Sequence, residues 1–109
     1  MKVLLISKKM NADATGDYNP NTGELTVLKG SVLSMELSQS RTFRGRKSIE
    51  KARNGVLKGN VLTQNVMFKS PSTAANFVTG GSSNGKRLWK TENGIAIGDL
   101  AKGGEPDVR

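Results

Sequence analysis

Apolar and polar positions in the first third of the chain follow patterns typical of short strands. Residues 2–7 are rich in Val, Leu and Ile and predict a short buried strand. A turn rich in Asn, Pro and Gly spans 19–23, and the strand pattern returns over 24–29. We therefore expect a hairpin across this turn, and a third strand over 32–37.

The pattern changes to helical spacing over residues 40–54. Gly45 weakens the first turn, so the regular helix is expected to begin near Arg46, and Gly55 supplies a stop signal. Ile49 and Ala52 share one side of this helix, which is its expected packing face.

The segment SPSTAANFVTGG carries the clearest helix signals in the chain. Ser70 is placed to cap the free amides, Pro71 suits the first turn, and Gly80 suits a left-handed exit. The remaining apolar runs predict short strands, with a TENG turn between the last two. These strands are expected at 66–69, 86–90 and 94–97.

These elements predict an α+β fold: a small, mostly antiparallel sheet with two short helices in a single compact domain. A chain of 109 residues has room for one core. We expect that domain over residues 1–101 and a flexible C-terminal tail over 102–109, where two Gly and a Pro occur.

Composition narrows the chemistry. The chain has no Cys and no His, which excludes disulfides, thiolate nucleophiles, imidazole bases and Cys/His zinc sites. Its nine acidic residues are scattered and do not form the grouped carboxylates of a metal-dependent nuclease. We expect no catalytic residues, no metal site and no cofactor. The N-terminal apolar run is too short for a signal peptide or a membrane span, which predicts a cytoplasmic protein.

Positive charge is concentrated in the middle of the chain. The formal net charge is +8, and residues 41–58 hold seven basic residues against Glu50 alone. Such a block favours an anionic partner. Basic residues at steps of three and four would form one helix face able to follow a phosphate backbone, with a solvated helix surface as the alternative. These residues are Arg41, Arg44, Lys47 and Lys51.

The stretch GGSSNGKR (80–87) has the GxxxxGK spacing of a P-loop, but Arg87 stands where Ser or Thr would hold magnesium. The loop also follows a predicted helix, whereas a P-loop precedes one, so ATP binding is not expected. Two interpretations remain open. The backbone amides form an anion-binding concavity beside Lys86, Arg87 and Lys90, or Asn84 and Gly85 simply make a tight turn.

Several further residues are candidates for nucleic-acid contact, each with a structural alternative. Trp89, the only Trp, is either a core anchor or a stacking platform for a base. Ser70 and Ser72 are either helix-capping residues or phosphate ligands. Ser82 and Asn84 carry side chains that hydrogen-bond base edges, although Asn before Gly is common in turns.

Three parts of the sequence carry a family resemblance. They are FKSPSTAANFVTGGSSNGKRLWK (68–90), LTVLKGS (25–31) and GVL (55–57). Over roughly residues 14–100 the chain resembles a small domain of unknown function found at the C-termini of GIY-YIG nuclease-family proteins. It is also similar to the restriction-enzyme adenine-methylase-associated (RAMA) domain. The matching positions are Lys29, Gly30, Ser31, Ser70, Pro71, Ser72, Ala74, Ala75, Ser82, Asn84, Gly85, Trp89 and Lys90.

The resemblance implies an α+β module linked to restriction, DNA-modification or nuclease systems, with DNA, including modified DNA, as the expected ligand. Two positions depart from the pattern. Gly81 stands where a basic residue is common, and Lys86 stands where an aromatic residue often follows Asn-Gly. The main hypothesis is a non-catalytic DNA-binding module. The alternative is a protein-interaction adaptor for a separately encoded nuclease or methyltransferase subunit.

Overall fold

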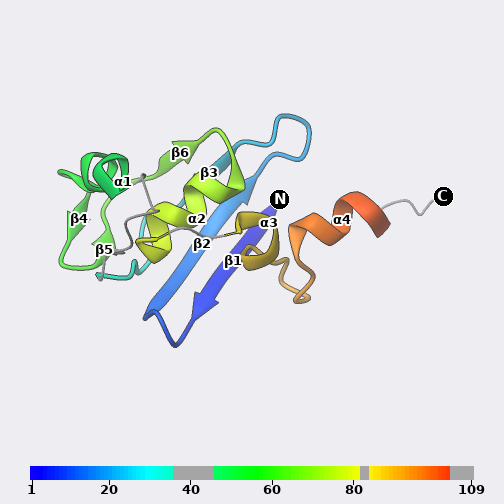
Figure 1. Cartoon of the computed structure of the whole chain (residues 1–109), viewed down its shortest axis with the longest axis horizontal. Coiled ribbons are helices and arrows are strands. Elements are labelled where there is room, and N and C mark those ends of the chain that lie inside the picture. Colours follow the sequence, from blue (N-terminus) through cyan, green and yellow to red (C-terminus); the bar gives the residue numbers. More distant parts are fainter. Residues whose placement is uncertain (36–45, 82–83, 104–109) are drawn as a thin grey trace.

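A four-stranded antiparallel sheet forms the base of the protein (Figure 1). The computed structural model describes residues 1–35, 46–81 and 84–103, with the backbone alone at 46 and 101–103. The strand order is β1-β2-β3-β6, and every pairing is antiparallel. The strands are β1 (Lys2–Ser7), β2 (Ala12–Tyr18), β3 (Leu25–Val27) and β6 (Val66–Phe68).

Helix α2 (Pro71–Thr79) packs on one face of this sheet, and a short hairpin lies beside the sheet (Figure 1). The described helices are α1 (Arg46–Arg53), α2 (Pro71–Thr79), α3 (Gly85–Leu88) and α4 (Ile97–Gly103). The hairpin consists of β4 (Leu57–Lys58) and β5 (Val61–Leu62). This architecture confirms the predicted α+β class with a mostly antiparallel sheet.

The core lies between the sheet and α2. Alternation along β1 buries Val3 and Leu5 toward α2, while Lys2 and Ile6 stay exposed on the other face. Small residues on β2, above all Gly16, leave room for the core. A Cβ at Gly16 would lie 2.8 Å from Leu25 Cδ2 and 3.2 Å from the Trp89 ring.

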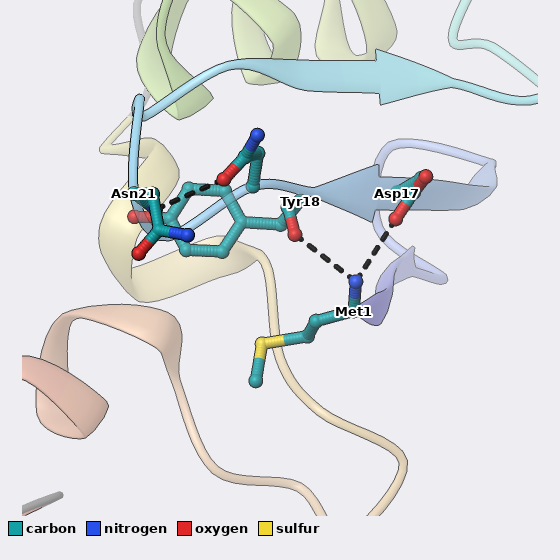
Figure 2. Close-up of polar contacts among 5 residues, drawn as sticks. Met1, Asp17, Tyr18 and Asn21 are labelled. Atoms are coloured by element: carbon teal, nitrogen blue, oxygen red, sulfur yellow. Dashed lines mark hydrogen bonds and ion pairs between the residues drawn. The ribbon is translucent and has the colours of Figure 1, made fainter.

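Local signals placed α2 and the first turn correctly. The Ser70 hydroxyl accepts a hydrogen bond from Thr73 N, Pro71 occupies the first turn, and Gly80 ends the helix at φ 82°. In the turn after β2, Gly23 N donates to Asn19 O at 2.8 Å. Asn21 N donates to Asn19 Oδ1 at 3.0 Å (Figure 2). The turn over 19–23 is confirmed and a hairpin crosses it, but its first strand is β2 (Ala12–Tyr18), which was not predicted from the sequence.

The helix predicted over 40–54 is confirmed in its regular part. Helix α1 begins at Arg46, and Gly55 follows it at φ 79°. The first residues of the predicted helix, 40–45, lie outside the described residues.

Three predicted strands are wrong or shorter than expected. In the described part of 32–37, only Val32 makes bridges, to Asp13 and Val61, because Ser34 N instead donates to Val78 O of α2. Residues 86–90 are mostly the helical turn α3. From 94–97 only a single bridge between Lys90 and Ala96 forms, after which α4 begins.

Two further short helices, α3 and α4, were therefore not predicted from the sequence. Helix α4 continues to Gly103, which takes in the first two residues of the predicted tail, and 104–109 lie outside the described residues. Within the described ranges, no helix combines the length and the apolar character needed to cross a bilayer.

Candidate nucleic-acid interface

Helix α1 presents two of the four basic residues expected on its outer face. Lys47 and Lys51 are exposed, one turn apart, while Ile49 on the other side is buried. Arg41 and Arg44 lie outside the described residues. Lys47 and Lys51 have no carboxylate within 4.0 Å in the described part of the chain. We call this pair the α1 group.

Arg53 belongs to the basic block in sequence but not on the surface. Its side chain is 9% exposed, and its guanidinium donates to main-chain carbonyls of two distant segments. Nε and Nη2 reach Phe77 O at 3.0 and 2.6 Å, and Nη1 reaches Ser34 O at 2.7 Å. Burial lowers the pKa of Arg53, but a guanidinium stays protonated at neutral pH.

The contacts of Arg53 correct the charge argument. The basic residues over 41–58 do not form one exposed surface, because the guanidinium of Arg53 is buried and holds α1 against the end of α2. The carbonyls of the last turn of a helix lack partners within the helix and carry partial negative charge. Arg53 satisfies them. Its sequence signal was its position four residues after Ile49, which places both on the buried side of α1.

A second basic group surrounds α3. Lys86, Arg87 and Lys90 are exposed, and none has a carboxylate within 4.0 Å among the described residues. We call these three the α3 group. The group is held in place by backbone contacts: Lys90 N and O bond with Leu4 on the edge of β1, at 2.9 and 2.7 Å.

Gly85 allows α3 to lie against the start of α2. A Cβ at Gly85 would lie 2.2 Å from Pro71 C and 2.4 Å from Ser72 N, closer than atoms approach. Gly85 N donates to Ser72 Oγ at 3.3 Å. The tight turn considered for Asn84 and Gly85 is helical and is not a hairpin turn. Gly85 instead opens a helical turn, in which Leu88 N donates to Asn84 O.

The serine and asparagine candidates have mixed outcomes. Ser70 is the N-cap of α2, as the capping interpretation predicted. Ser72 accepts the bond from Gly85, so its hydroxyl serves packing between two helices. The side chain of Asn84 is exposed and makes no cap hydrogen bond. Ser82 lies outside the described residues, together with the middle of the proposed anion concavity.

Trp89 is the core anchor and not an exposed platform. Its side chain is 0% exposed, and its Nε1 donates to Pro71 O at 3.1 Å. A ring that stacks on a base must expose one face. The stacking interpretation of Trp89 is therefore wrong for this arrangement. Although Trp89 is close to Arg87 and Lys90 in the sequence, those two side chains are exposed and the Trp89 side chain is not.

The structure keeps the two basic groups apart. Helix α2 lies between them, with α1 toward one end of the molecule and α3 toward the middle (Figure 1). Arg53 of α1 contacts the C-terminal end of α2, and Gly85 of α3 contacts its N-terminal end. The expected convergence of all the basic residues on one patch is replaced by two groups flanking one helix.

Glu50 is the acidic residue of α1, and further acidic side chains lie on other parts of the surface. Asp13 and Asp17 are exposed on the face of the sheet away from α2. The N-terminal ammonium of Met1 bonds Asp17 Oδ1 at 2.9 Å and Tyr18 O at 3.1 Å (Figure 2). Lys2 lies 3.8 Å from Glu92. These two carboxylate pairs lie away from the α1 group.

An open groove of about 990 Å³ was not foreseen from sequence. It lies between the turn that joins β1 to β2, the segment 32–35 and the end of α2. Ile6, Lys8, Lys9 and Met35 are among the residues that line it, and the side chains of Ile6 and Met35 are exposed. Its sequence signal was weak, because its walls come from four separate parts of the chain.

The chain matches a known family over most of its length. Residues 4–101 match the model of a family described as Domain of unknown function (DUF4357). The chain belongs to this family. Neither the search of curated proteins nor the search of solved structures gave a match. The DUF4357 match spans all of β1 except its first two residues and extends into α4, so it includes both basic groups and the groove.

Proposed function

We propose that this DUF4357 domain is a non-catalytic DNA-binding module that contacts the phosphate backbone through the α1 and α3 groups. The observation that supports it is the set of exposed cations on and around these helices with no described carboxylate at ion-pair distance. Unpaired exposed cations favour a polyanion, because binding releases the counterions condensed on it.

The sequence resemblance adds context to this proposal. The similarity to domains of GIY-YIG nuclease-family proteins and to RAMA domains supports a proposed link to restriction, modification or nuclease systems, with DNA, including modified DNA, as the proposed ligand. Trp89 is not part of the proposed surface. The proposed contacts among the described residues are Lys47, Lys51, Asn84, Lys86, Arg87 and Lys90. Arg41, Arg44 and Ser82, which lie outside the described residues, remain proposed contacts on sequence grounds alone.

Binding to duplex DNA is expected to weaken steeply with salt. Phosphate contacts by the five described cations give a log-log slope of about −4.5, a loss of about 2.7 decades in affinity between 50 and 200 mM salt. Fluorescence anisotropy with a labelled duplex measures this slope. Each lost contact makes the slope about 0.9 less negative. The Lys47→Ala/Lys51→Ala double variant removes two contacts, so its slope should be about 1.8 less negative than that of the native protein.

The matched control is Lys2→Ala, which removes the same charge at a site already beside Glu92. It should leave the slope close to that of the native protein. A Lys86→Ala/Arg87→Ala variant tests the α3 group separately. If neither double variant changes the slope more than the control does, the proposed surface is wrong.

A second candidate function is an adaptor that binds a nuclease or methyltransferase subunit. The observation favouring it is the groove lined by Ile6 and Met35, both exposed, since exposed apolar residues around a groove are typical of protein interaction sites. Isothermal titration with a purified partner subunit would test it. Binding that persists after nuclease treatment supports the adaptor, and binding lost with that treatment contradicts it.

A further inference from the structure

Strand β1 has an outer edge that is covered at only one residue. In the neighbouring strand, Asp13 N and O bond with Val32 on the far side. Asp13 is the register partner of Ile6. In an antiparallel ladder, successive residues direct their backbone groups alternately to either side. Ile6, opposite Asp13, therefore directs its N–H and C=O away from β2.

Leu4 has the same orientation two residues earlier and does have a partner. Its N donates to Lys90 O at 2.7 Å and its O accepts from Lys90 N at 2.9 Å. Ile6 has no such partner: within the described parts of the chain, its backbone N–H and C=O make no hydrogen bond. The segment that pairs with β1 does not extend from Leu4 to Ile6, because the residues before Lys90 form helix α3. In Figure 1 the arrowhead end of β1 extends past α3.

Exposed edges are usually protected, because a free N–H and C=O pair invites another strand. Here the edge is not protected by its side chain either, since Ile6 is 62% exposed. The same residue lines the groove, whose lining also includes Met35, 59% exposed. Lys8 and Lys9 follow directly along the chain, exposed and with no described carboxylate within 4.0 Å.

We propose that the edge of β1 at Ile6 is a docking site for an extended segment of a partner protein, which pairs its backbone with Ile6. The apolar lining favours an aliphatic side chain in that segment, and Lys8 and Lys9 favour acidic residues at the end that reaches the turn. Backbone pairing supplies affinity, and the flanking side chains supply selectivity. This inference rests on the adaptor candidate and does not depend on DNA binding.

A second copy of the chain does not fit this edge. A two-fold pairing centred on Ile6 would set residue 8 of one copy opposite Leu4 of the other. That position is already filled by Lys90. The formal net charge of +8 also opposes self-association. An acidic segment of a different protein is not opposed by charge, and it avoids Lys90 if its extended part ends at the residue that pairs with Ile6.

The test is an NMR titration of the full chain with two synthetic peptides of equal length, EDTVTVTDE and KKTVTVTKK. The acidic peptide should shift the amides of Ile6 and Lys8, and its saturation should slow hydrogen exchange at the Ile6 amide about tenfold. The basic peptide should bind more weakly. Failure of the acidic peptide to shift the Ile6 amide at about 1 mM would overturn the proposal.

Ile6→Pro removes the one free donor that the proposal requires. Proline is tolerated on an edge strand where its nitrogen faces away from the ladder, so this variant should fold, as checked by Trp89 fluorescence. It should bind the acidic peptide about tenfold more weakly, whereas Ile6→Val, which keeps the donor, should bind like the native chain. Equal binding by a folded Ile6→Pro variant contradicts the proposal.

A charge variant keeps the proposal testable whether or not Ile6→Pro folds. Lys8→Glu with Lys9→Glu should reverse the preference between the two peptides, and an unchanged preference contradicts the proposed role of these lysines. The Lys86→Ala/Arg87→Ala double variant separates peptide binding from DNA binding. It should keep peptide binding even if DNA binding is lost. A duplex that shifts the Ile6 amide as the peptide does would assign this edge to DNA and overturn the inference.

Discussion

Gly85→Ala is expected to destabilise the protein by about 3 kcal/mol, although propensity alone predicts the opposite sign. Alanine is favoured over glycine by about 1 kcal/mol inside a helix, and the φ of Gly85 is not positive. Against this, the new Cβ would lie 2.2 Å from the Pro71 carbonyl carbon. Backbone cannot rotate away as a side chain can, so α3 must move off α2.

That movement breaks two further contacts. Gly85 N would leave Ser72 Oγ, and Trp89 Nε1 would be pulled from Pro71 O. Overpacking in a filled core costs about 1–3 kcal/mol and occasionally more, before lost hydrogen bonds are counted. The clash and these losses together exceed the gain in propensity.

Urea unfolding followed by fluorescence measures the effect of Gly85→Ala directly, because Trp89 is the only Trp and is fully buried. The matched control is Asn84→Ala, one residue earlier, with an exposed side chain that makes no cap hydrogen bond. It should change stability by no more than about 0.5 kcal/mol. If Gly85→Ala is as stable as this control, α3 does not pack on α2 as described.

Arg53→Ala is expected to cost about 3 kcal/mol of folding stability, through carbonyls left without donors. Ser34 O and Phe77 O each depend on the guanidinium, whereas Val78 O keeps its bond from Ser34 N. A buried acceptor that loses its partner costs about 1–3 kcal/mol, and two are lost here. The Arg53 Cζ also lies 5.8 Å from the Phe77 ring centroid, within range of a cation–π contact.

Thermal unfolding of two further variants identifies the cause. Arg53→Met keeps much of the apolar stem without donors and should be nearly as unstable as Arg53→Ala. Arg53→Lys keeps the charge, but one ammonium does not reproduce the planar fork that reaches two segments, so its stability should be intermediate. Lys51→Ala, which removes an exposed charge from the same helix, should stay within about 0.5 kcal/mol of the native protein. Equal stability of Arg53→Ala and Lys51→Ala would contradict the buried arrangement.

The role of Arg53 bears on the proposed function. A variant with reduced DNA binding at this position would say nothing about phosphate contact, because the side chain holds α1 against α2 and thereby positions Lys47 and Lys51. Functional substitutions are therefore best confined to exposed cations. The α1 and α3 groups meet this condition, because each of their members is exposed.

The sequence predicted correctly those local features that depend on residues close together in the chain. The cap at Ser70, the exit at Gly80 and the turn before Gly23 were predicted because each uses a side chain or a glycine to satisfy backbone only a few residues away. It failed over 86–90, where the apolar and basic pattern resembled a strand. The choice there depended on whether Gly85 could approach Pro71, which no local pattern records.

By itself, the sequence determined the fold class, the caps of α2 and the excess of positive charge, because composition and short-range hydrogen bonds do not depend on the path of the chain. Only the tertiary structure decided which cations reach solvent and which apolar groups remain exposed. Arg53 meets carbonyls 19 and 24 residues away, and Trp89 meets one 18 residues away. The free edge at Ile6 likewise depends on a distant segment: Lys90 pairs with Leu4, but the residues before Lys90 form α3 and do not continue along β1. Contacts of this range follow from packing the whole chain, and spacing along the sequence does not encode them individually.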